Sequence, residues 1–217
     1  MDTKVGIAID IGGTTVRDRI LDAADMLLGR YGYKKMTMDD IARAAGIGKA
    51  TIYLHFEGKQ QVVLQRLDRL VDRLLVHLRK VAQQQDSTAA ERVRSMLIER
   101  VLIRVDAAQH YSESISDLLA DLRDVFLRRR EEYFQRELDV FEAVIRQGQQ
   151  SGEFIDADAR SLARAAVGAT NSLLPYSLTA QELGNRTQIK KQVSDIADLL
   201  LFGMQKHHKY AGRITSP

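Results

Sequence analysis

The sequence predicts an all-α fold, and three observations support this. Apolar residues recur at helical spacing almost everywhere after Arg17. Strand-like alternation is scarce, and only two prolines, Pro175 and Pro217, occur to interrupt a helix. The 217-residue chain is 45% hydrophobic and 28% charged, as in a globular protein that buries a core of ordinary size.

The N-terminal part of the chain predicts three short helices. The first begins near Arg17 and is expected to be ended by Gly29, Tyr31 and Gly32. A second covers about residues 38–45, with Thr37 as its N-cap, and a third covers about 49–55. Residues 1–16 precede this pattern, and we expect them to form a separate arm.

The rest of the chain predicts longer helices. A long helix over about 59–82 is followed by a polar loop at 83–88 and, later, by a turn at 152–156. Further helices are expected at 89–105, 114–128, 131–151, 157–174 and 187–206. We therefore expect four parts, namely an arm over 1–16, a first domain over 17–64, a second domain over 65–206 and a tail over 207–217.

Residues 38–56 meet the physical requirements of a helix-turn-helix. Ala42 is small enough for two helices to cross closely, and Gly46 tolerates the positive φ that the turn needs. The residues expected to pin the helices together are Ile41, Ala45, Ile47, Ile52 and Phe56. The next helix is expected to turn a set of side chains outward, as a helix in the major groove does: Lys49, Ala50, Thr51, Tyr53, Leu54 and His55. A helical hairpin with a glycine turn would not explain this face.

Charge is distributed unevenly along the chain. The segment from Arg17 to Lys80 holds 13 Lys and Arg against 8 Asp and Glu, whereas residues 81–217 hold 18 against 19. A basic segment is typical of a module that neutralises phosphates, although many solvated helices are also mildly basic. Charge alone leaves both interpretations open.

The stretch 20–64 contains TMDDIARAAGIGKATIYLHFEGKQQVV and resembles the DNA-binding domain of the TetR family of bacterial repressors. The remainder matches that family mainly in helix pattern and length. The resemblance implies an all-helical homodimer that binds a palindromic operator and releases it when a small molecule occupies the C-terminal domain. We expect a ligand-responsive repressor and not an enzyme. The alternative is a DNA-binding protein of the same architecture that responds to a protein partner, or to no effector at all.

The resemblance also carries DNA contacts over by position. The positions concerned are Thr37, Met38, Arg43, Gly48, Lys49, Ala50, Thr51, Tyr53, His55 and Lys59. The start of the first motif helix, at Thr37, offers backbone N–H groups and a hydroxyl to a phosphate. Ala50 is placed to touch a base methyl, and Lys59 resembles a phosphate clamp. Arg43 could contact a base edge or a phosphate, and it could equally be a solvated charge on the helix face.

A second motif lies in the N-terminal arm. Residues 5–15 read VGIAIDIGGTT and resemble the first phosphate loop of sugar kinases, in which glycines approach phosphate and Asp10 would organise Mg²⁺. The kinase fold needs a second phosphate loop, a catalytic base and far more β structure. Because an amphipathic helix begins at Arg17 instead, we keep a kinase only as an unfavoured alternative.

The second domain is expected to hold the effector and the dimer interface. The effector candidates, which are polar or aromatic groups on apolar faces, are Arg104, His110, Tyr111, Tyr133, Phe134, Phe141 and Asn171. Each also has an ordinary structural interpretation: an ion-pair partner, a surface loop residue, core packing or an interhelical hydrogen bond. The dimer is expected to use the last two helices, through the apolar stripes Ala163, Ala166, Val167, Ala169, Thr170, Leu173 and Ile189, Val193, Ile196, Leu200, Leu201, Met204.

Several classes of function are not supported. The chain has no cysteine, so it offers no disulfide, thiol nucleophile or zinc-thiolate site. His207 and His208 are adjacent and lack a third ligand at helical spacing, so we expect neither a metal nor another cofactor. Without a secretory signal or a long apolar run, the sequence predicts a cytoplasmic protein.

Overall fold

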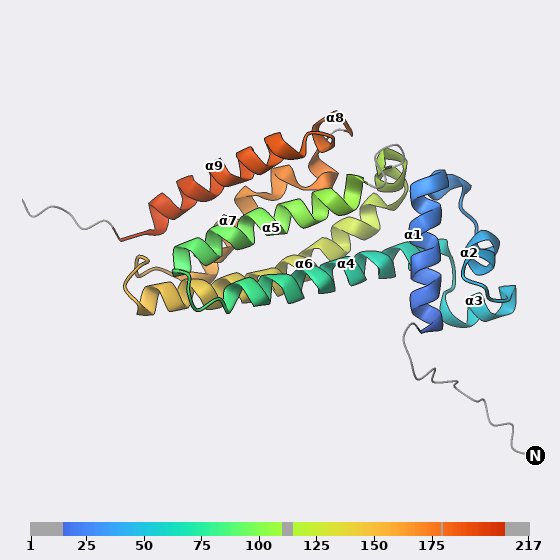
Figure 1. The fold of residues 1–217 in the computed structure, drawn as a ribbon, viewed down its shortest axis with the longest axis horizontal. Coiled ribbons are helices and arrows are strands. Elements are labelled where there is room, and N and C mark those ends of the chain that lie inside the picture. Colours follow the sequence, from blue (N-terminus) through green and yellow to red (C-terminus); the bar gives the residue numbers. More distant parts are fainter. Residues whose placement is uncertain (1–14, 110–114, 179, 207–217) are drawn as a thin grey trace, which may run out of the picture. The chain divides into compact units, whose positions relative to one another are not determined.

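The computed structural model describes residues 15–109, 115–178 and 180–206, and the regular elements in these ranges are helices (Figure 1). The predicted all-α fold is confirmed. In chain order the elements are α1 (Val16–Lys35), α2 (Met38–Ala44), α3 (Lys49–His55), α4 (Lys59–Ala82), α5 (Ala89–Gln109), α6 (Ile115–Gln150), α7 (Ala159–Ala169), the 3₁₀ turns η1 (Asn171–Leu173) and η2 (Pro175–Ser177), α8 (Ala180–Leu183) and α9 (Arg186–Met204).

The chain divides into two compact units. The first consists of Met1–Asp72 and Ala107–Arg129, and the second of Arg73–Asp106 and Arg130–Pro217. Helices α4, α5 and α6 therefore each contribute residues to both units. We describe each unit by itself.

In the first unit, local side-chain caps set the starts of α1 and α2. The Thr15 hydroxyl accepts from the N–H of Asp18, and the Asp18 carboxylate accepts from the N–H of Thr15, which is a capping box. Thr37 and Asp40 repeat this arrangement at α2. At the other end of α1, Gly32 leaves the helical region with φ 73°, so the break lies at Gly32, whereas Gly29 and Tyr31, which were also expected to end the helix, remain helical.

Ion pairs join α1 to the first part of α4 in the same unit. Arg66 pairs with Asp25, and Arg69 pairs with Asp22. The Arg17 guanidinium lies 4.7 Å from the centre of the Phe56 ring, between α3 and α4. The first part of α4 is thereby held to α1 by charged groups.

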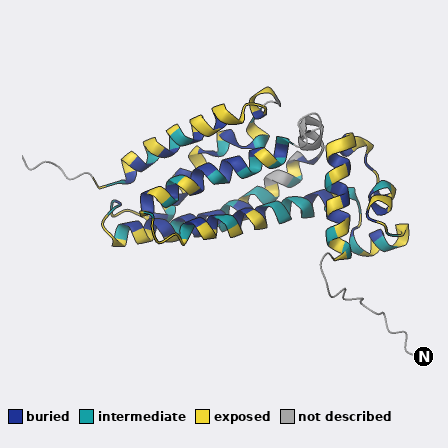
Figure 2. Cartoon of the chain, in the orientation of Figure 1, coloured by how far each residue is buried: buried dark blue, intermediate teal, exposed yellow. Residues whose placement is uncertain are grey.

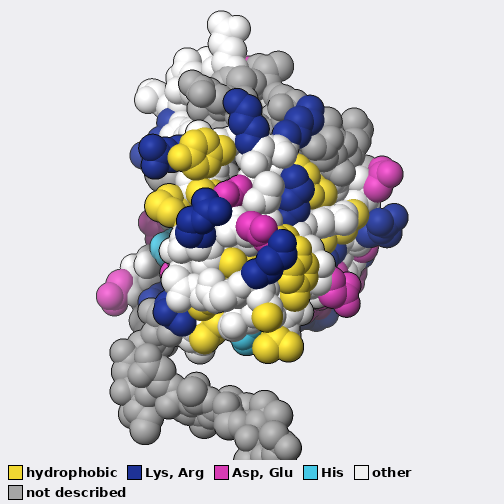
Figure 3. All heavy atoms as spheres, turned by 90° about the vertical axis from the view of Figure 1, so that its right-hand side faces the viewer, with side chains coloured by type: hydrophobic (Ala, Val, Ile, Leu, Met, Phe, Trp, Pro, Cys, Tyr) yellow, Lys and Arg dark blue, Asp and Glu magenta, His cyan; other side chains and the backbone are white. Residues whose placement is uncertain are grey.

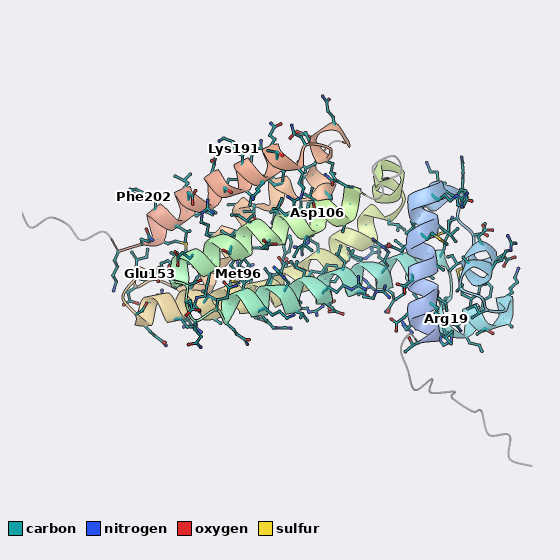
Figure 4. All side chains as sticks on the ribbon, in the orientation of Figure 1. Arg19, Met96, Asp106, Glu153, Lys191 and Phe202 are labelled. Atoms are coloured by element: carbon teal, nitrogen blue, oxygen red, sulfur yellow. The ribbon has the colours of Figure 1, made fainter. Side chains whose placement is uncertain are left out.

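The second unit is built around α5. Three consecutive α5 residues, Met96, Leu97 and Ile98, are all buried, so this helix is covered on several sides (Figures 2 and 4). A core cluster joins α5 to η1 and α9 and consists of Ile98, Val101, Leu102, Val105, Leu173, Leu174, Ile189 and Val193.

Polar groups secure the ends of these helices. The Glu153 carboxylate accepts from the backbone N–H groups of Ala89 and Ala90, both at 2.9 Å, and so caps the start of α5. Two bidentate ion pairs join α5 to α9: Arg94 with Asp198, and Arg186 with Asp106.

Four expectations about the helices need correction. The helices expected at 114–128 and 131–151 are one helix, α6, because the residues between them include neither proline nor glycine. The helix expected at 89–105 extends to Gln109. The helix expected at 157–174 ends at Ala169 and continues as 3₁₀ turns before Pro175. The short helix α8 was not predicted.

Candidate DNA-binding surface and effector site

The turn between α2 and α3 has the backbone that its sequence predicts. Gly46 has φ 66°, in the left-handed region that favours glycine. Its N–H donates to the carbonyl of Arg43 at 3.2 Å, and the N–H of Ile47 donates to the carbonyl of Ala42 at 3.0 Å. These bonds satisfy the last carbonyls of α2 and turn the chain into α3.

Buried apolar side chains fix α3 by one face. Ile41, Ile52 and Phe56 are buried, as expected, and Ala42 and Ala45 are buried where the helices approach each other. Ile52 is the one buried residue of α3. The remaining side chains of this helix therefore lie at or near the surface.

The exposed face of α3 consists of Lys49, Ala50, Tyr53 and Leu54. Leu54 is 84% exposed, which is unusual for a large apolar side chain. Thr51 and His55 are half-buried at the edge of this face. Leu54 was not among the expected DNA contacts, although its position four residues after Ala50 places both on the same helix face.

Lys49 is already engaged by a neighbour. Its Nζ lies 2.9 Å from Oδ2 of Asp39 in the first turn of α2, and both side chains are exposed. The hydrogen bond to Asp39 raises the pKa of Lys49, so the ammonium stays charged. A phosphate that approaches Lys49 meets this carboxylate as a competitor.

The expected contacts on α2 differ in how they can act. The Thr37 hydroxyl donates to the Asp40 carboxylate at 2.6 Å and accepts from the Asp40 N–H, so the helix cap already uses the hydroxyl both as donor and as acceptor. Met38 has a buried side chain, which leaves it only backbone groups to offer. Arg43 is exposed and lies 3.6 Å from Asp40. Gly48 is exposed and begins α3 without a side-chain cap.

Figure 3 shows Lys and Arg side chains spread over this face of the molecule, with Asp and Glu among them.

Lys59 has structural partners that the sequence did not reveal. Its Nζ donates to the carbonyls of Tyr33 at 3.0 Å and Met36 at 3.2 Å, at the end of α1. It also lies 4.5 Å from the centre of the Tyr33 ring. These contacts explain a lysine at the start of a helix in structural terms, and a phosphate contact by Lys59 stays a prediction.

The structure brings three of the expected effector residues together, because Arg104, Phe134 and Asn171 each contact Arg100 or its partner Glu137. Tyr133 and Phe141 are buried in the core, and Phe134 is half-buried against the α5 cluster. Arg104 is an ion-pair partner of Glu137, and the Asn171 Oδ1 accepts from Arg100 at 2.7 Å. His110 and Tyr111 lie outside the described residues.

A buried ion cluster, missed from the sequence, lies beside Arg104 and Asn171. Arg100 and Glu137 have no exposed side-chain surface, and they pair with each other. The spacing gives a signal in hindsight: Arg100 lies three residues after Leu97 on a buried face of α5, and Glu137 lies midway between Tyr133 and Phe141. A charge at such a position requires a partner.

The expected dimer residues need correction. Most members of the two apolar stripes, including Ala163, Val167, Val193 and Leu201, are buried within the chain itself. They pack α7 and α9 onto the core of the second unit and are not available to a partner. The exposed apolar side chains of α9 are Leu199 and Phe202, the latter 66% exposed (Figure 4).

Two further findings concern the described residues alone. No group of three or more His, Cys, Asp or Glu side chains there is arranged to hold a metal ion. None of the helices found there is both long and apolar enough to cross a membrane. The DIGGT stretch and the pair His207 and His208 lie outside the described residues.

Known proteins resemble this chain in sequence and in fold. Residues 20–65 match the family described as bacterial regulatory proteins, tetR family. The fatty acid metabolism regulator protein of Bacillus subtilis (strain 168) is 24% identical over 157 residues, which cover 70% of this chain and 77% of that protein. The negative transcriptional regulator of the biofilm operon, IcaR, of Staphylococcus aureus (strain Newman) is 37% identical over 59 residues, 27% of this chain and 32% of that protein. The triclosan complex of SmeT, from Stenotrophomonas maltophilia, aligns with a TM-score of 0.62 and 21% identity over 93% of this chain and 98% of that one.

Proposed function

Because this chain belongs to the TetR family of bacterial DNA-binding transcriptional regulators, we propose that it is a repressor that binds a palindromic operator as a homodimer and releases it when a small molecule binds. Members of this family are regulators and not enzymes, so the kinase alternative has no support. A repressor is favoured because IcaR, which the N-terminal part resembles, is a negative regulator. In this proposal residues 17–64 are the DNA-binding domain and 65–206 the regulatory domain.

The observation that carries the proposal is the exposure of α3. Ile52 is the one buried residue within α3, and Lys49, Ala50, Tyr53 and Leu54 are exposed. A seven-residue helix with such a face fits the major groove, where its first residues reach base edges. We assign base contacts to Ala50 and Leu54, which suit thymine methyl groups.

Phosphate contacts would flank the groove. In this proposal Lys49 leaves Asp39 for a phosphate, and the N–H groups at Met38 and Gly48 face the backbone of the two strands. Thr51, Tyr53 and His55 complete the contacts from α3. Arg43 and Lys59 add positive charge, and the hydroxyl of Thr37 acts mainly through its cap.

The dimer would use the outer faces of α7 and α9. Exposed Leu199 and Phe202 on α9 and exposed Ala165 and Ala169 on α7 give large and small apolar side chains for a four-helix interface. A dimer presents two copies of α3 to two half-sites one helical turn, about 34–36 Å, apart. A palindromic operator follows from that symmetry.

Release by a ligand requires differential binding. The small molecule would bind more tightly to the conformation in which the recognition helices are misplaced. It would weaken operator binding by the difference between its binding free energies for the two conformations, typically about 1–3 kcal/mol. Ligand control is supported by the SmeT complex, in which a protein of this fold holds triclosan. We place the effector in the second unit, near Arg104, Phe134 and Asn171.

The direct test selects the operator from random duplex DNA with the full-length protein. We expect an inverted repeat, and we expect affinity that falls steeply as salt rises because each half-site makes several phosphate contacts. Failure to enrich any sequence above background would overturn specific operator binding. Enrichment of a single unrepeated half-site would overturn the dimer.

The dimer is tested separately by sedimentation of the Phe202→Glu variant. A buried carboxylate at this position should yield monomers and loss of operator binding. The control is Val76→Glu, which places the same charge at an exposed apolar position of α4 and should remain dimeric. Monomeric wild-type protein, or a dimeric Phe202→Glu variant, would contradict this interface.

A further inference from the structure

Three guanidinium groups and one carboxylate meet between α5, α6 and the η1 and η2 turns of the second unit. Arg100 and Glu137 are fully buried, and Arg104 is only 12% exposed. Arg130, which is half-buried, lies 5.5 Å from the Phe134 ring centre. Within the part of the chain that the structure describes, Glu137 is the one carboxylate that pairs with any of the three.

The other partners of these arginines are neutral. Arg100 donates from Nη1 to Thr170 Oγ1 and from Nη2 to Asn171 Oδ1, each at 2.7 Å. Arg104 donates from Nη1 to the backbone carbonyl of Arg100 at 3.2 Å. Hydrogen bonds to neutral oxygens satisfy the donors without cancelling charge. The cluster therefore carries a surplus of positive charge in a place with little water.

The pKa directions agree with this charge surplus. Burial lowers the pKa of Arg100, and the neighbouring Arg104 lowers it further, against the attraction of Glu137. Burial alone would raise the pKa of Glu137, but Arg100 and Arg104 together hold it below its ordinary value. The two arginines thus outweigh the burial of the Glu137 carboxylate, whereas Glu137 does not outweigh the burial of the Arg100 guanidinium.

An apolar surface adjoins the charged groups. The Arg100 and Arg130 guanidinium groups lie 5.3 and 5.5 Å from the centre of the Phe134 ring. Phe134 and Leu178 are partly buried and pack against the core cluster of α5, η1 and α9. Tyr176 of η2 is partly exposed, and its ring centre lies 5.7 Å from Arg130. Surplus positive charge thus lies beside partly covered aromatic and aliphatic side chains.

We propose that this cluster binds a small amphipathic anion, with its carboxylate or phosphate head at Arg104 and Arg130 and its apolar body against Phe134 and Leu178. The ligand supplies the negative charge that the cluster lacks, and charge-assisted hydrogen bonds to arginine hold its head. The inference rests on the proposed function in that this anion would be the effector. A cluster that served only to join α5 to α6 would have no need of a third arginine.

The test uses ten-carbon probes that differ only in the head group: decanoate, decyl phosphate and the uncharged decyl maltoside, each below its critical micelle concentration. Binding to the full-length protein is measured by calorimetric titration and by the shift in melting temperature. We expect at least one anion to bind and raise the melting temperature, and we expect decyl maltoside to do neither.

Two variants locate the head group, and one controls for charge. Arg104→Gln and Arg130→Gln should each weaken anion binding by about tenfold or more. Arg130 has no ion-pair partner among the described residues and contacts only the rings of Phe134 and Tyr176 and the Tyr176 side chain, so we expect Arg130→Gln to fold even if Arg104→Gln does not. Arg94→Gln removes the same charge from the N-terminal part of α5, where the half-buried Arg94 pairs with Asp198, and should keep affinity within about twofold.

The proposal is overturned if neither anion binds, if decyl maltoside binds equally well, or if Arg130→Gln binds as tightly as the wild type. Operator affinity measured in the same samples separates this outcome from failure of the proposed function. Anion binding at the cluster with unchanged operator affinity would leave the site in place and refute its role as the effector site.

Discussion

The backbone of Gly46 adopts a conformation that other residues reach only at a cost. Its φ of 66° is left-handed, and a Cβ built there meets nothing within 4 Å, so any penalty comes from the backbone alone. We expect Gly46→Ala to lower the free energy of unfolding by about 1–2 kcal/mol. Denaturant unfolding of the wild type and the variant measures this change in the free energy of unfolding. Gly58→Ala, where space is equally open and φ is ordinary, should cost much less, and equal losses at both positions would contradict the argument.

Lys59 combines a structural contact with a predicted phosphate contact. Lys59→Met should lower the free energy of unfolding by about 1–2 kcal/mol, because carbonyls of Tyr33 and Met36 lose a charged donor. If Lys59 also binds phosphate, the variant should bind all DNA sequences more weakly, and the slope of log affinity against log salt should fall by about one. An unchanged slope together with reduced stability would leave only the structural role.

Residues with local partners could be predicted from the sequence, and residues with distant partners could not. Thr37 and Gly46 were predicted because a cap and a turn depend on neighbours within a few positions. Lys59 bonds carbonyls more than twenty residues away, and Arg100 pairs with Glu137 on another helix. Sequence periodicity marks such charges as unusual but does not say which groups meet them.

Among the helices, α6 shows how a single glycine admits a bulky side chain. Phe154 folds back onto Gly148, and a Cβ at Gly148 would lie 2.3 Å from its ring. We expect Gly148→Ala to cost about 1–3 kcal/mol of unfolding free energy through overpacking. Gly168→Ala in α7 meets nothing within 4 Å and should be neutral or stabilising. Thermal unfolding of the two variants gives the comparison, and similar stability would contradict the packing.

The limits of α3 and α4 match the predicted ranges because Gly48 and Gly58 mark their starts. The limits of α6 and α7 do not match. We expected one helix to end at 128 and another to begin at 131, but residues 129 and 130 are both arginine, which is a good helix former, and the helix continues. The end of α7 depends on Thr170, whose hydroxyl bonds back to the carbonyl of Val167 and accepts from Arg100. No local pattern contains that tertiary contact.

At the scale of the whole molecule, Glu137 links stability to pH. Its folded pKa lies below the ordinary 4.5, so it stabilises the fold above pH 4.5, and this contribution is lost as pH falls through the lowered value. Glu137→Gln should lose about 3–5 kcal/mol at pH 7, because it leaves Arg100 buried without a carboxylate. Unfolding measured between pH 7 and pH 3 should show a weaker pH dependence for the variant. If the free energy of unfolding of Glu137→Gln fell with pH as steeply as that of the wild type, other carboxylates would dominate acid unfolding.

The central claim is that the exposed face of α3 enters the major groove of the operator. Affinity of the Ala50→Glu variant for the selected operator tests it most directly, with Gln84→Glu as a control that adds the same charge in the exposed loop after α4. We predict that Ala50→Glu keeps the melting temperature and oligomeric state of the wild type but loses affinity by about a hundredfold or more, because the carboxylate meets base edges and phosphates. Gln84→Glu should bind normally. Equal operator affinity for wild-type and Ala50→Glu proteins would contradict the claim.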